Sequence, residues 1–115
     1  MGRFDFSGPY AVRPIHGAGK LLAMLEFVDA ETGLVFRDFQ LFESANGPFV
    51  KADQRVYEKN GEVKRIPHVQ PAKDNVAGRR WFREVADAAY QAYEAFLRTA
   101  PNASEQRRSV RTVAE

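Results

Sequence analysis

The chain has 115 residues, of which 44% are hydrophobic and 28% are charged. These proportions are ordinary for a globular protein, and the length allows one domain with a single modest core. Cysteine is absent, which excludes disulfides, thiolate metal sites and cysteine nucleophiles. No apolar leader opens the chain and no run approaches the roughly 20 apolar residues of a membrane span, so we expect a cytoplasmic protein.

The formal net charge is only +2, but the charge is unevenly distributed. Residues 51–83 carry nine Lys or Arg against four Asp or Glu. A protein with such an asymmetry presents one basic face to an anion while staying nearly neutral overall.

The first part of the chain predicts β-strands. Residues 1–9 have the composition of a flexible lead-in, and Tyr10–His16 is an edge strand because Pro14 cannot donate to a sheet ladder. Lys20–Val28 is mostly apolar, which predicts a strand covered on both faces or pairing at an interface.

The next strand, Leu34–Glu43, is rich in β-forming residues of mixed polarity. Strict alternation along a strand divides its side chains into two sets. One face receives Phe36, Asp38, Gln40 and Phe42, and the other receives Val35, Arg37, Phe39, Leu41 and Glu43.

A basic hairpin follows. Phe49–Tyr57 and Glu62–Ile66 flank Asn60-Gly61. Asn-Gly between β-type runs favours a type I′ turn, because both central residues of that turn need positive φ.

From Val76 onward the apolar period becomes helical. The predicted stripe consists of Phe82, Val85, Ala86, Ala89, Tyr93, Phe96 and Leu97. Asp74 or Asn75 is the N-cap, and Pro101 ends the helix. Residues 101–115 are polar and aperiodic, so we expect a disordered basic tail.

Strands followed by one long helix predict an α+β fold, a small antiparallel β-sheet with a C-terminal α-helix, within residues 10–100. The sheet has more aromatic residues than one helix can cover. We therefore expect a homodimer joined by strand pairing or sheet packing.

Two groups of cations are candidate nucleic-acid-binding residues, since Lys and Arg neutralise phosphates. They are Lys51, Arg55, Lys64 and Arg65 around the hairpin, where Lys59 also lies, and Arg79, Arg80 and Arg83 at the helix start. The alternative for the hairpin is a solvated edge that Lys and Arg protect from aggregation. The alternative for Arg83 is an ion pair with Asp87 on the same helix face.

Catalytic candidates are weaker. Gly17-Ala18-Gly19-Lys20 lacks the Ser or Thr and the earlier Gly of a phosphate-binding loop, so it is a turn. His16 and His68 have no partner nearby in sequence, and Asp38 could act as a general base but lacks a partner acid or nucleophile. We interpret all three as structural, with Asp38 bonded to backbone amides or paired with an Arg. We expect no enzyme, no cofactor and no metal.

The runs GKLLAMLEFVD, VFRDFQLFESANGPFVKADQRVY and NGEVKRIPH give the chain a family likeness between Gly19 and Phe96. In these runs it resembles the bacterial septation-regulator family, also called stage V sporulation protein G. The resemblance implies a sheet with a C-terminal helix, a dimer joined through strands, and binding of DNA or RNA in gene regulation. The family usually continues Phe-Val with Met-Pro-Ser and a basic residue. Here Lys51-Ala52-Asp53-Gln54-Arg55 follows, and only Arg55 fills a basic position of that motif.

These observations together predict a dimeric nucleic-acid-binding regulator that uses the basic hairpin and the helix start. The alternative function is a non-enzymatic protein–protein adaptor that uses the aromatic sheet face of the same scaffold. Neither function needs a membrane or a small-molecule substrate.

Overall fold

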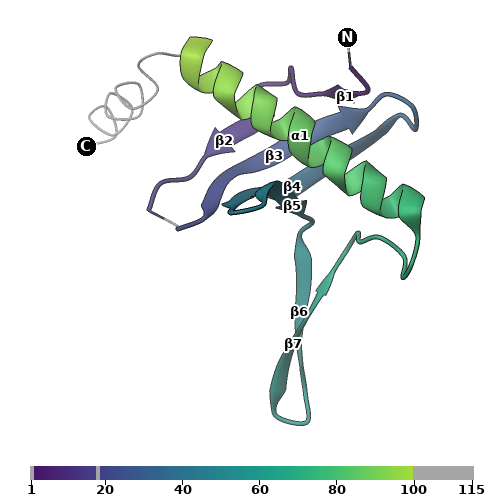
Figure 1. Cartoon of the computed structure of the whole chain (residues 1–115). Coiled ribbons are helices and arrows are strands. Elements are labelled where there is room, and N and C mark those ends of the chain that lie inside the picture. The colour runs from purple at the N-terminus through teal and green to yellow at the C-terminus, as the bar shows by residue number, and fades with distance from the viewer. Residues whose placement is uncertain (1, 18, 100–115) are drawn as a thin grey trace.

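The computed structural model describes residues 2–17 and 19–99, and it confirms the α+β fold (Figure 1). The predicted tail, 101–115, lies outside these described residues. The elements in chain order are β1 (Phe4–Asp5), β2 (Val12–Pro14), β3 (Leu21–Asp29), β4 (Leu34–Ser44), β5 (Gly47–Lys51), β6 (Gln54–Lys59), β7 (Glu62–Pro67) and α1 (Val76–Thr99).

A five-stranded antiparallel sheet forms the body, with the order β1-β3-β4-β5 and with β2 also paired to β3. Its first strand comes from residues that the sequence led us to treat as a lead-in. Phe4 pairs with Asp29 at the end of β3, and the Ala30 N–H donates to the Arg3 carbonyl at 2.8 Å. The N-terminal segment therefore contributes backbone pairing to the fold.

The predicted strand Phe49–Tyr57 is wrong, because the chain divides it between two sheets. Strand β5 ends at Lys51 and pairs with β4, whereas β6 begins at Gln54 and pairs with β7. Ala52 lies between them and is 2% exposed, so its methyl group is anchored in the core. At Asp53 the chain turns out of the body, and the Asp53 carbonyl accepts the His68 N–H at 2.8 Å.

The strict alternation predicted for β4 is also wrong, because a β-bulge interrupts it at Asp38. Leu25 pairs with Phe39 and Glu26 pairs with Arg37, which leaves Asp38 without a partner across the ladder. Asp38 has a φ of 60°, a left-handed conformation that Asp tolerates better than most residues. The extra residue turns Phe36 and Phe39 to the same side of the sheet.

Helix α1 lies across one face of the sheet, and the core forms between them (Figure 1). The sheet contributes Leu25, Phe27, Phe39 and Leu41, and the helix contributes Val85, Ala86 and Ala89. The Asn75 side-chain oxygen accepts the Gly78 N–H at 2.8 Å, which confirms Asn75 as the N-cap. The predicted stripe is right except at Leu97, which is 40% exposed.

We call the other side of the five-stranded sheet the open face. It carries the apolar side chains Met24, Val28, Val35, Phe42 and Phe49, which lie opposite the helix side by strand alternation. The Phe42 and Phe49 rings stack with centroids 5.1 Å apart. Ion pairs of Arg37 with Glu26 and of Arg13 with Asp38 occupy the same side.

Candidate nucleic-acid interface

Strands β6 and β7 form a separate two-stranded ribbon that projects from the body (Figure 1). Asn60 and Gly61 have φ values of 53° and 79°, and Lys59 pairs with Glu62 across the turn. This confirms the predicted two-residue turn, since both central residues have the positive φ of a type I′ turn. The ribbon holds its cations away from the sheet and the helix.

The ribbon has two different faces, because side chains alternate along each strand. The face that we call the cationic face carries Arg55, Tyr57, Lys59, Glu62, Lys64 and Ile66. The face that we call the mixed face carries Gln54, Val56, Glu58, Val63, Arg65 and Pro67. The cationic face thus has three cations against one carboxylate, and the mixed face has one of each.

Contacts along the cationic face agree with this division. The Arg55 guanidinium lies 5.2 Å from the centroid of the Tyr57 ring, and Lys64 Nζ lies 2.8 Å from Glu62 Oε2. Arg55 and Lys59 make no ion pair within the described part of the chain. Their charges are therefore available to an anionic ligand.

Two of the predicted hairpin cations lie elsewhere. Arg65 pairs with Val56 on the mixed face, so it points away from Arg55 and Lys64. Lys51 belongs to β5 and not to the ribbon. Its ammonium lies over the open face, 5.5 Å from the Phe42 ring centroid and 5.9 Å from that of Phe49. The sequence reasoning grouped these residues by proximity along the chain.

The second predicted cluster lies on the first turns of α1. Arg79, Arg80 and Arg83 are all exposed, and the first turn contains no acidic residue. The alternative ion pair between Arg83 and Asp87 is not formed among the described residues. Arg80 borders a shallow cleft of about 410 Å³ together with Arg3 and Trp81. The positive end of the helix dipole adds to the potential of this region.

A buried carboxylate, Asp29, holds this helix start against the sheet. Its side chain is 1% exposed and receives hydrogen bonds from Arg3 Nε at 2.8 Å, Arg3 Nη2 at 3.0 Å and Trp81 Nε1 at 3.0 Å. The Glu31 N–H donates a further bond at 3.0 Å. The bonds from Arg3, helped by those from Trp81 and Glu31, hold the pKa of Asp29 well below its usual range despite burial.

Sequence reasoning missed this cluster. Arg3 and Trp81 lie 26 and 52 residues from Asp29, and no local spacing connects them. The only available signal was an Asp at the end of an apolar strand, which is ordinary for a turn. The cluster is structural, but it sets the position of Trp81 and hence of the arginines beside it.

The weaker catalytic candidates stay apart. Arg13 Nη2 lies 3.1 Å from Asp38 Oδ1, so Asp38 is paired with an Arg as the structural interpretation predicted. His68 Nδ1 lies 3.9 Å from Asp53 Oδ2, and His16 is exposed. Within residues 2–17 and 19–99, no group of three or more His, Cys, Asp or Glu side chains could hold a metal ion.

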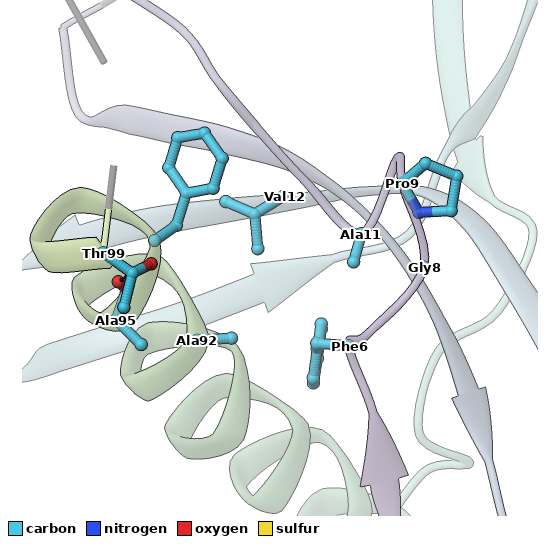
Figure 2. A pocket seen from close by; sticks show the side chains of 9 residues that line it. Phe6, Gly8, Pro9, Ala11, Val12, Ala92, Ala95 and Thr99 are labelled. Carbon is cyan, nitrogen blue, oxygen red and sulfur yellow. Dashed lines mark hydrogen bonds between the residues drawn. The ribbon is translucent and has the colours of Figure 1, made fainter. Parts of the chain in front are cut away.

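A second cleft, of about 310 Å³, lies between the N-terminal segment and the last turns of α1 (Figure 2). Its lining is Phe6, Gly8, Pro9, Ala11, Val12, Ala92, Ala95, Phe96 and Thr99. None of these side chains titrates near neutral pH, so this lining assembles no acid–base chemistry.

Among the described residues, no helix has both the length and the hydropathy needed to cross a membrane. Comparison with known proteins gave no match, whether with family models, with curated proteins or with solved structures. The geometry of the chain itself therefore supplies the functional argument.

Proposed function

We propose that this chain is a cytoplasmic nucleic-acid-binding regulator of the septation-regulator type, acting without catalysis or a cofactor. The cationic face of the ribbon is the observation that carries the proposal. Its Arg55 and Lys59 are exposed, lack ion-pair partners among the described residues, and stand on a ribbon that projects from the body. Exposed cations on one surface neutralise phosphates and release their counterions.

The helix start extends the same binding surface. Figure 1 shows the chain leaving the ribbon at β7 and passing through one loop to the start of α1. Lys73 lies in this loop, and the exposed Arg79, Arg80 and Arg83 follow it on the first turns of α1. They supply phosphate contacts, which position a nucleic acid without reading its sequence.

We further propose that the chain acts as a homodimer. The open face carries apolar side chains, and Val35 on it is 46% exposed. Sheet packing against a second copy would remove this surface from water, which stabilises association. The ribbons and helix starts of two copies would then act together on one nucleic acid.

Binding of fluorescently labelled DNA and RNA over a salt series tests the function. The decisive variant replaces three cations of the proposed surface by Ala, namely Arg55, Lys64 and Arg80. Its control removes two Arg and one Lys that are also exposed but lie off this surface, namely Lys20, Arg65 and Arg98.

The first variant should lose at least about tenfold in affinity at roughly 0.1 M salt. Its plot of log affinity against log salt concentration should be less steep, by the equivalent of up to about three phosphate contacts. The control should lose much less. Equal losses would show that net charge alone drives binding, and no binding by the unmodified chain would refute the function.

A protein–protein adaptor is the second candidate, because the open face carries the apolar side chains Met24, Val28, Val35, Phe42 and Phe49. The Phe42–Phe49 stack with Lys51 beside it would suit a partner that presents apolar and acidic side chains. Phe42→Asp should abolish capture of such a partner, and any fall in its nucleic-acid affinity should match that of Val35→Glu, which charges the same face and disrupts the proposed dimer. If instead no nucleic acid binds and this variant alone loses an interaction, the adaptor function replaces the first proposal.

A further inference from the structure

We infer that the cationic face of the ribbon docks flat on the floor of the major groove of duplex DNA, with the mixed face turned outward. This inference rests on the proposed function and names its ligand and its mode of binding. Docking through one face predicts different losses of affinity for cations that a purely electrostatic interaction would make equivalent.

The shape of the ribbon fits this groove. Six-residue strands extend about 20 Å, and two paired strands lie about 5 Å apart before side chains are added. The B-form major groove is about 12 Å wide and 8.5 Å deep and admits a two-stranded ribbon, whereas the minor groove is only about 6 Å wide. The major groove of duplex RNA is too deep and narrow for side chains to read. Duplex DNA is therefore the ligand that a projecting ribbon fits.

The chemistry of the cationic face suits base edges. Arg55 has no ion-pair partner among the described residues, and its guanidinium lies 5.2 Å from the centroid of the Tyr57 ring. An Arg in this setting can donate two hydrogen bonds to guanine O6 and N7, the commonest specific contact in the major groove. Ile66 lies directly across from Arg55 and is 44% exposed. It offers an apolar surface to a thymine methyl group.

The remaining cations of this face differ in availability. Lys59 lies near the turn without an ion-pair partner in the described chain, so it can reach a phosphate of the groove wall. Lys64 is held by Glu62 at 2.8 Å and must exchange that partner for a phosphate. Arg55 should therefore contribute the most to discrimination between sequences.

The mixed face provides an internal control. Arg65 is exposed, sits on the neighbouring strand and has the same charge as Arg55, but it lies on the opposite face. Removing either residue changes the net charge equally. Only docking through one face predicts that the two removals differ.

The experiment adds the full chain to fluorescently labelled nucleic acids and measures their anisotropy. The three probes are a duplex DNA selected from a random pool, the separated strands of that duplex, and a duplex RNA of the same sequence. Arg55→Gln should weaken duplex DNA binding at least about tenfold, as expected for loss of a bidentate base contact. Arg65→Gln should change it less than about twofold. Melting curves of both variants check that the fold is kept, and both side chains are exposed.

A chemical probe identifies the groove. Bound protein should protect guanine N7 from methylation by dimethyl sulfate, and the minor-groove ligand netropsin should not displace it. Equal losses for the two variants, tighter binding of the separated strands or of RNA, or unprotected guanine N7 would each overturn the inference while leaving the proposed function standing. Absence of binding to every probe would overturn both.

Discussion

The buried carboxylate of Asp29 should be a sensitive polar site for the stability of the sheet–helix body. The substitution Asp29→Asn keeps the size of the side chain but removes its charge. One oxygen becomes an amide donor, so at least one of the bonds from Arg3, Trp81 and Glu31 is lost. Arg3 also loses the carboxylate that faces it at 2.8 Å.

The magnitude follows from burial. Breaking a fully buried ion pair by removing one partner costs about 3–5 kcal/mol. Arg3 is 29% exposed and can turn toward water, so we expect a loss below this range, about 2–3 kcal/mol. That corresponds to a decrease of roughly 8–13 °C in the melting temperature of a domain of this size.

Asp38→Asn is the matched control. Asp38 also pairs with an Arg, at 3.1 Å, but both side chains are about half exposed. Exposed pairs contribute at most about 1 kcal/mol, and Asn tolerates the positive φ of this position. Urea denaturation of the two variants and the unmodified chain compares the free energies of unfolding directly. A loss for Asp29→Asn no larger than that for Asp38→Asn would refute the reasoning.

The pH dependence tests the same contact independently. The pKa of Asp29 is lower in the folded chain than in the unfolded chain, so the unfolded state takes up the proton first as the pH falls. The stabilisation from Asp29 is complete above the unfolded pKa, near 4, and is lost progressively below it. Asp5 also has a lowered pKa, because Ser7 donates to it, and this contribution remains in the variant. As the pH falls from about 5 to about 2, the free energy of unfolding should therefore decrease less for Asp29→Asn than for the unmodified chain. Parallel curves of unfolding free energy against pH would contradict this.

Three further predictions concern the dimer, the ribbon and the helix. Val35→Glu should convert the proposed homodimer to a monomer by charging the open face, and light scattering should then give the mass of one 13.0 kDa chain. A single-chain mass for the unmodified protein at micromolar concentration would refute the dimer. Gly61→Val should disrupt the turn, where φ is 79°, and should weaken nucleic-acid binding while leaving the melting temperature of the body within a few degrees. Asn75→Ala should cost about 1 kcal/mol by removing the bond to the Gly78 N–H, and circular dichroism during denaturation would show an unchanged midpoint if the cap is unimportant.

Local features of the fold could be predicted from the sequence because neighbouring residues determine them. The Asn60-Gly61 turn, the Asn75 cap and most of the helix stripe depend on backbone preferences and on a 3.6-residue period. The two faces of the ribbon also follow from local information, since a two-residue turn sets the register that pairs Lys59 with Glu62. That register by itself places Arg65 and Arg55 on opposite faces of the ribbon.

The tertiary structure decided the features that depend on distant partners. The bulge at Asp38 is set by pairing with β3, and the break between β5 and β6 arises because Ala52 is drawn into the core. Arg3, Asp29 and Trp81 meet only when the N-terminal strand, β3 and α1 are assembled. The sequence alone determined which cations lie near one another along the chain. Whether Lys51, the ribbon cations and the helix-start arginines share a surface depends on the three-dimensional packing, because Ala52 is buried between β5 and β6 and these two strands belong to different sheets.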